Sequence, residues 1–186
     1  MEMARVFDLI AMIVLLIVLV LPKASLSAKP ALETLGPKTP QGLDPTDLDR
    51  LAALEDQHFA LPENVDRSVD LAEMDLRLLR PAWALSTLAE YDDRGDYRVF
   101  LLETTAHAER LEPADTVAAA KRGLDACDHD PKCTDGARVK INLIAASMQV
   151  LIDRHIDPQK DPQKAKEAVA SVLHAATAKG KAALPQ

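Results

Sequence analysis

Prolines that follow aspartates mark helix starts in this chain, and they constrain its fold more than any other feature. Asp44-Pro45 and Asp161-Pro162 each place a capping carboxylate before a proline. Proline is favoured at the first helical position, where its missing N–H would have no partner. Pro81 should interrupt what otherwise looks like one long helix. The pattern predicts a series of helices joined by short turns.

The composition agrees with a helical chain. Apolar residues make up 48% of the sequence, but aromatic residues only 3%, and a set dominated by Ala and Leu favours helices over strands. Asp96 and Asp135 are expected to cap two of the helices. We predict an all-α fold, built from stacked antiparallel hairpins or as an irregular bundle. The predicted helices span about 45–58, 68–79, 81–93, 96–110, 114–126, 135–155 and 162–178.

The segment 135–155 carries two apolar stripes at helical spacing. A helix that is apolar on two sides needs neighbours on both sides, so this one is expected in the middle of a helical stack. The first stripe is Val139, Leu143, Ala146 and Val150, and the second is Ile141, Ala145, Met148 and Ile152.

Thirteen consecutive apolar residues, Leu9 to Leu21, predict a membrane-directed segment. The run is shorter than the roughly 20 residues of an ideal spanning helix and matches the core of a signal peptide, with cleavage expected after Ser27. The acidic residues before the run and Lys23 after it favour a retained anchor with a cytoplasmic domain instead. Export, to the periplasm if the source is bacterial, is the leading prediction.

Four parts of the chain follow from these features. Residues 1–27 are a signal peptide or signal anchor, and residues 28–43 form a linker rich in proline. The helical domain is expected at 44–180, with a short tail at 181–186. One domain suits this length.

The charge balance argues against nucleic acid as a partner. The net charge is −7, so a polyanion would be repelled on average. The six glycines are too scattered for a phosphate-binding loop. No cofactor is expected.

The stretch from Leu88 to Asp115 resembles one tetratricopeptide repeat. Leu88, Tyr91, Gly95 and Tyr97 fall at the spacing of that family's first helix, turn and second helix. A weaker similarity runs over 141–176. The resemblance implies stacked hairpins with a groove that binds a peptide or a partner helix. Trp83 and Phe100 are expected to pack with the two tyrosines in the core of the hairpin.

Cys127 and Cys133 flank a short polar loop, and a disulfide is the leading interpretation for an exported domain. Metal ligation by both cysteines with His129 is the sharper alternative, and free thiols are the third. Neither catalytic residues nor a metal site are expected elsewhere, because no known catalytic or metal-ligand spacing occurs.

The leading functional hypothesis is a non-enzymatic scaffold of the cell envelope that binds another protein or peptide through its helical surface. One alternative is an accessory subunit of a membrane complex, anchored by an uncut N-terminal segment. A second alternative is a small metal-binding or enzymatic helical domain.

Overall fold

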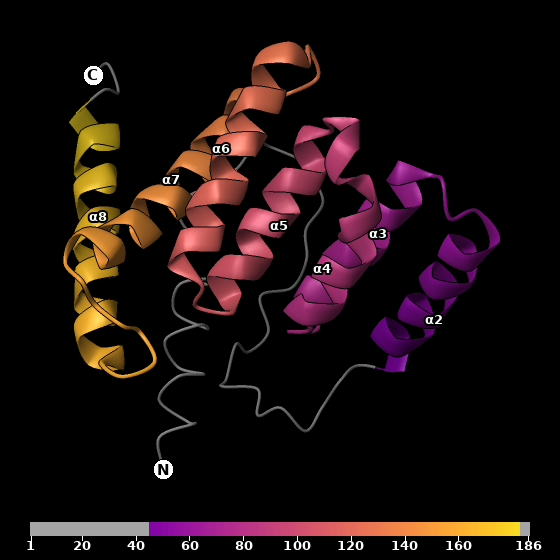
Figure 1. Cartoon of the computed structure of the whole chain (residues 1–186), viewed down its shortest axis with the longest axis horizontal. Coiled ribbons are helices and arrows are strands. Elements are labelled where there is room, and N and C mark those ends of the chain that lie inside the picture. The colour runs from indigo at the N-terminus through magenta and orange to yellow at the C-terminus, as the bar shows by residue number, and fades with distance from the viewer. Residues whose placement is uncertain (1–44, 183–186) are drawn as a thin grey trace.

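The computed structural model describes residues 45–182, and this part of the chain is all-α, as predicted (Figure 1). Its helices are α2 (Pro45–Ala60), α3 (Val65–Arg77), α4 (Pro81–Leu88), the 3₁₀ helix η1 (Ala89–Arg94), α5 (Tyr97–Glu109), α6 (Pro113–His129), α7 (Asp135–Asp153) and α8 (Pro162–Ala182). Between residues 45 and 182, no helix is long and apolar enough to cross a membrane. The predictions for 1–43 lie outside the described residues.

Most helix ends fall within a few residues of the predicted ones, because local signals set them. Pro81, Pro113 and Pro162 each occupy the first position of a helix. The carboxylate of Asp96 accepts the backbone N–H of Arg98 and so caps α5, as predicted.

Two boundary predictions are wrong. The helix expected at 81–93 is regular only to Leu88 and continues as the tighter η1. The predicted cap Asp135 is instead the first residue of α7, and the hydroxyl of Thr134 accepts the N–H of Ala137. Thr134 has the extended backbone of a cap residue, so its side chain reaches the first turn.

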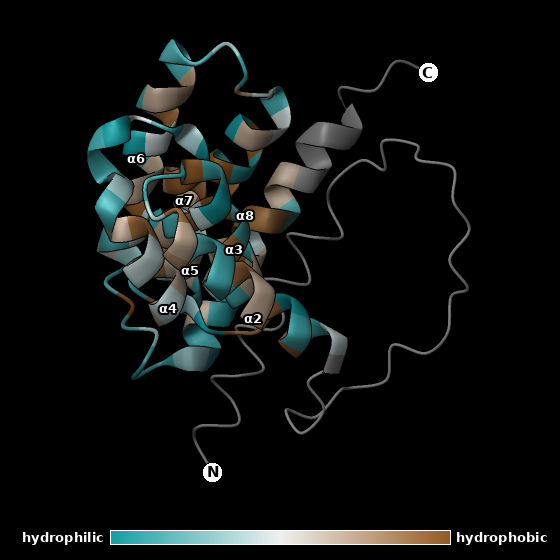
Figure 2. Ribbon diagram, turned by 90° about the vertical axis from the view of Figure 1, so that its right-hand side faces the viewer, coloured by the Kyte–Doolittle hydropathy of each residue, from teal (hydrophilic) through white to brown (hydrophobic). Residues whose placement is uncertain are grey.

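The helices form a row in which each packs against its neighbours in sequence (Figure 1). In addition, α3 contacts α5 and α5 contacts α7. The apolar core accordingly divides into successive clusters, from one between α2 and α3 to one between α7 and α8. Figure 2 shows hydrophobic segments gathered where α5, α7 and α8 meet. Each helix therefore depends on near neighbours in the chain for its burial.

Three helices of the row end in the same backbone motif. Leu79, Leu111 and His155 follow α3, α5 and α7 and have positive φ angles of 57°, 57° and 52°. At each end the N–H of the following residue returns to a carbonyl five residues earlier, as Arg80 does to Asp75 (2.8 Å) and Glu112 to His107 (3.0 Å). These are Schellman motifs formed without glycine. After α3 and α5, a proline two residues later starts the next helix.

Gly123 brings three helices together. A Cβ at this position would lie 3.2 Å from both Phe100 of α5 and Ile141 of α7. Because that spacing is tighter than ordinary van der Waals contact, glycine is needed for α6 to sit closely between α5 and α7.

The prediction for 135–155 is correct about its surroundings and wrong about its faces. Helix α7 contacts α5, α6 and α8. One continuous stripe is buried, formed by Ile141, Ile144, Met148 and Leu151. Val139, from the first predicted stripe, and Ile152, from the second, are 60% and 38% exposed. The neighbouring helices contact α7 along adjoining sides, so one broad apolar stripe is buried against all of them.

The aromatic residues do not form the single cluster that the sequence suggested. Tyr91 is fully buried between α3, α4 and α5, whereas Tyr97 packs in the next cluster, beside α6. Phe100 is 5% exposed and faces α6. Trp83 is 62% exposed, so its predicted place in the core is wrong. Gly95, with φ of 67°, forms the expected tight turn before α5.

Candidate functional site

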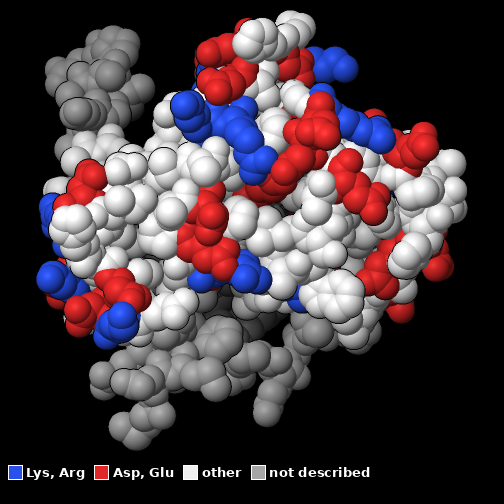
Figure 3. Space-filling model, viewed as in Figure 1, with Lys and Arg blue, Asp and Glu red and all other residues white. Residues whose placement is uncertain are grey.

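Charged side chains gather on the face of the molecule over α5, α6 and η1 (Figure 3). Arg122 of α6 lies at the centre of one group, 2.9 Å from Asp92 of η1 and 2.9 Å from Glu103 of α5. Its guanidinium also covers the ring of Phe100, 5.0 Å from the ring centre. This group joins three helical segments through one cation.

The two carboxyl groups around Arg122 differ in protonation. Burial, together with the hydrogen bond to Asp92 and its charge, raises the pKa of Glu103 to about 8. Burial alone would raise the pKa of Asp92 too, but hydrogen bonds from Glu103 and Arg122 lower it. At neutral pH, therefore, Glu103 keeps its proton and Asp92 is ionised. Because Arg122 contacts both carboxyl groups, the arrangement ties α5 to α6.

A second polar group lies where α5 ends and α6 begins. His107, Glu112 and Asp115 bring one potential ligand atom each within 4.8 Å of one another. His107 Nδ1 is 2.7 Å from Glu112 Oε2, and Arg110 holds the other carboxylate oxygen of Glu112 at 2.7 Å. Burial would raise the pKa of Glu112, but the hydrogen bonds from His107 and Arg110 lower it. These residues could hold a metal ion.

The turn between α3 and α4 has the same backbone but different side chains. Asp75, at the position that corresponds to His107, is 2% exposed, and Arg80 Nε lies 3.2 Å from its Oδ1. Burial outweighs the Arg80 charge and raises the pKa of Asp75 to about 6. Leu79 and Trp83 project outward, 58% and 62% exposed, with the Arg80 guanidinium 5.0 Å from the centre of the Trp83 ring.

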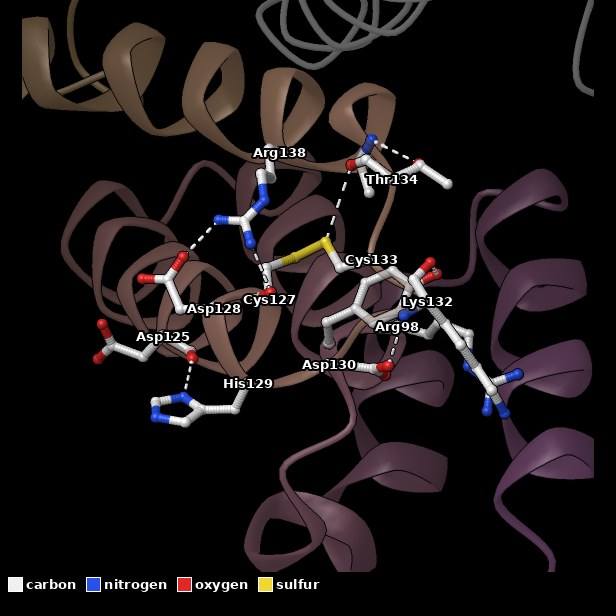
Figure 4. Close-up of a disulfide and its surroundings, with 12 residues drawn as sticks. Arg98, Asp125, Cys127, Asp128, His129, Asp130, Lys132, Cys133, Thr134 and Arg138 are labelled. Carbon is white, nitrogen blue, oxygen red and sulfur yellow. Dashed lines mark hydrogen bonds and ion pairs between the residues drawn. A yellow bond between two sulfur atoms is a disulfide. The ribbon is translucent and has the colours of Figure 1, made fainter.

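The cysteine pair forms the disulfide predicted from the sequence, with an S–S distance of 1.97 Å (Figure 4). Arg138 of α7 reaches back to the carbonyl of Cys127 and to the carboxylate of Asp128, both at 2.5 Å. His129 bonds the carbonyl of Asp125 instead of approaching the sulfurs. The alternative of metal ligation by the two cysteines and His129 is therefore wrong, because both sulfurs are used in the disulfide.

A buried hydroxyl network fixes the turn between α2 and α3. The Ser68 hydroxyl donates to Tyr91 Oη at 2.7 Å and lies 3.1 Å from His58 Nδ1. The Tyr91 hydroxyl in turn donates to the carbonyl of Pro62. Ser68 is fully buried, so these contacts hold the turn in place and leave the hydroxyl inaccessible to a substrate.

The structure separates the residues that the sequence grouped as a partner-binding hairpin. Tyr91, Tyr97 and Phe100 belong to packing, and Gly95 belongs to the turn. Among the four aromatic residues of this group, Trp83 alone is largely exposed. Sequence reasoning missed His107, Glu112 and Asp115 because no familiar motif has their spacing, and it missed Arg122 because its contacts depend on the α5–α6 register.

No family model, curated protein or solved structure matches this chain. Its function must therefore be argued from the fold and from these side chains.

Proposed function

We propose that this chain is a non-enzymatic helical scaffold, similar in kind to tetratricopeptide-repeat proteins, that binds another protein or peptide. The exposure of Trp83 carries the proposal. It is the chain's single tryptophan, and it is 62% exposed, whereas Tyr91, Tyr97 and Phe100 are buried or half-buried. Phe59 is the other largely exposed aromatic residue among the described residues. Exposed tryptophan is costly in water and is enriched among residues that dominate protein interfaces.

The surroundings of Trp83 suit an apolar contact of a protein partner. Leu79 lies four residues earlier, in the turn before α4, and is 58% exposed. Leu48, at the start of α2, is 44% exposed, and its neighbour Asp47 pairs with Arg77, two residues before Leu79. Figure 1 shows the start of α2 and the α3–α4 turn at the same end of the molecule. We infer that these side chains make up the docking surface.

The rigid turn supports this role. The Schellman motif and Pro81 fix the backbone on both sides of Arg80, and the ion pair with Asp75 orients the guanidinium beside Trp83. A partner would therefore lose little conformational freedom of the scaffold on binding. The N-terminal apolar segment, Leu9 to Leu21, would hold the scaffold at a membrane or direct its export.

Paired variants test the proposal. Full-length tagged protein is isolated from its native membranes as wild type, as Trp83→Ala and as Phe59→Ala. Phe59 is 79% exposed and lies at the opposite end of α2, so it controls for the loss of an exposed aromatic ring. We expect a stoichiometric partner to be lost with Trp83→Ala and retained with Phe59→Ala. Equal recovery from all three proteins would contradict the proposal.

The same preparation distinguishes the scaffold proposal from the alternative of an accessory subunit in a membrane complex. Mass spectrometry of the purified protein that finds an intact N-terminus, with several membrane proteins retained in Trp83→Ala, would favour that alternative.

A further inference from the structure

Three side chains with different ligand atoms meet at the α5–α6 turn. His107 comes from the last turn of α5, Glu112 from the residue before α6, and Asp115 from the first turn of α6. Their ligand atoms lie within 4.8 Å of one another. Among the described residues, this is the group of three potential metal ligands that lie so close together. One imidazole nitrogen and two carboxylate oxygens form a mixed ligand set of the type that binds divalent transition metals.

The backbone holds this set in place. The N–H of Glu112 bonds the carbonyl of His107 at 3.0 Å, and Leu111 between them is 6% exposed in the core. The Thr116 hydroxyl bonds the carbonyl of Glu112 at 2.8 Å. The two ends of the ligand set are thus joined by a short, anchored turn, which reduces the ordering that metal binding would require.

The hydrogen bonds leave ligand positions open. Arg110 occupies Glu112 Oε1 through two contacts of 2.7 Å, so Oε2 is the oxygen that faces His107. The Asp115 carboxylate is exposed and has no hydrogen bond or ion pair in the described part of the chain. Asp115 can therefore rotate towards the other two residues without breaking an existing contact.

The α3–α4 turn has the same backbone as the α5–α6 turn but carries different side chains. The backbone motif therefore does not dictate the three potential ligands of the α5–α6 turn. In the α3–α4 turn, the positions of His107, Glu112 and Asp115 are taken by Asp75, Arg80 and Trp83. Opposite charges close that turn without any external ion. At the α5–α6 turn, Arg110 pairs with Glu112, but the Asp115 carboxylate has no ion pair in the described part of the chain, and a bound cation would supply the charge that it lacks.

We propose that His107, Glu112 and Asp115 bind a divalent transition-metal ion, with Zn²⁺ as the best fit. Three protein ligands would leave a fourth position for water or for a ligand from a partner. Ligand atoms around a tetrahedral zinc lie about 3.3 Å apart with bonds of about 2.0 Å, so Asp115 moves inward on binding. The ion would join α5 to α6. This inference is independent of the docking surface at Trp83.

Isothermal titration with zinc chloride tests the site on the full-length protein. Wild type should bind one Zn²⁺, and both His107→Ala and Asp115→Asn should weaken binding by at least about tenfold. Asp115→Asn changes one exposed side chain, so it separates ligand loss from misfolding. His129→Ala, an exposed histidine at the α6–α7 loop, should bind as wild type does.

Several outcomes would overturn the inference. These are no stoichiometric zinc binding by wild type, unchanged affinity in both ligand variants, and equal loss in His129→Ala. Tighter binding of Ca²⁺ than of Zn²⁺ would also overturn it, because calcium prefers oxygen ligands over imidazole.

Discussion

The turns α3–α4 and α5–α6 are built on one backbone and differ in the side chains they present. Both end in a Schellman motif with leucine at φ of 57° and both restart at a proline. The first pairs the buried Asp75 with the partly exposed Arg80 and exposes Leu79 and Trp83. The second buries its leucine and gathers His107, Glu112 and Asp115 near the surface.

In both turns the backbone motif fixes where the side chains lie, but it does not determine which residue types occupy these positions. An apolar, aromatic tip suits contact with a protein, and a set of nitrogen and oxygen ligands suits a cation. We therefore assign two separate roles to equivalent places in the row of helices.

Glycine at the two leucine positions should have opposite effects. Leu111→Gly removes a buried side chain and should lower the free energy of unfolding by about 2 kcal/mol, even after relief of the left-handed backbone. Leu79→Gly loses little burial and should raise it by about 0.5 kcal/mol. Urea denaturation of both variants measures the difference. Destabilisation of similar size in both would contradict the difference in burial between the two leucines.

Zinc should stabilise one turn and not the other. At zinc concentrations about 100 times the dissociation constant, the free energy of unfolding of wild type should rise by about 2.7 kcal/mol. Thermal denaturation with and without zinc measures this shift. Trp83→Ala should keep it and Asp115→Asn should lose at least about half of it. A shift of undiminished size in Asp115→Asn would place the ion elsewhere.

Asp75 should make stability depend on pH. Its pKa is raised from 3.8 to about 6 by burial, so the folded state binds the proton more tightly than the unfolded state. The stabilisation of the folded state by the Asp75 proton is present below about pH 4 and is lost as pH rises through about 6. Asp75→Asn should therefore gain roughly 1 kcal/mol relative to wild type over that range. Chemical denaturation from pH 4 to 7 tests this, with the exposed Asp115→Asn as the charge control, and parallel curves for Asp75→Asn and wild type would contradict it.

Trp83→Ala should have the smallest effect on stability. Because the side chain is 62% exposed, its loss should change the free energy of unfolding by less than about 0.5 kcal/mol. Thermal denaturation checks this value against Phe59→Ala. A loss of several kcal/mol would mean that Trp83 packs inside the domain after all.

Local signals in the sequence predicted the helices well. Prolines at 81, 113 and 162 begin helices, Gly95 forms a left-handed turn, and the Asp96 side chain caps α5, because each acts within a few residues. The disulfide followed from short spacing between the two cysteines.

Features that depend on packing between helices could not be predicted in the same way. The exposure of Trp83 depends on which side of α4 faces α3, and composition contains no such information. The contact of Arg122 with Glu103 requires the register of α5 against α6. His107 meets Glu112 only because the Schellman motif folds the chain back between them. The left-handed residues Leu79, Leu111 and His155 could not be predicted either, because glycine is the usual sequence signal for this backbone and none of the three is glycine.

Site-specific photo-crosslinking tests the scaffold proposal most directly. A photoreactive aromatic residue replaces Trp83 in the full-length protein, and the same residue replaces Phe59 in a control. After illumination in native membranes, position 83 should give one discrete adduct with a protein partner and position 59 should give none. Identical adducts from both positions, or no adduct from position 83, would contradict the proposed docking surface.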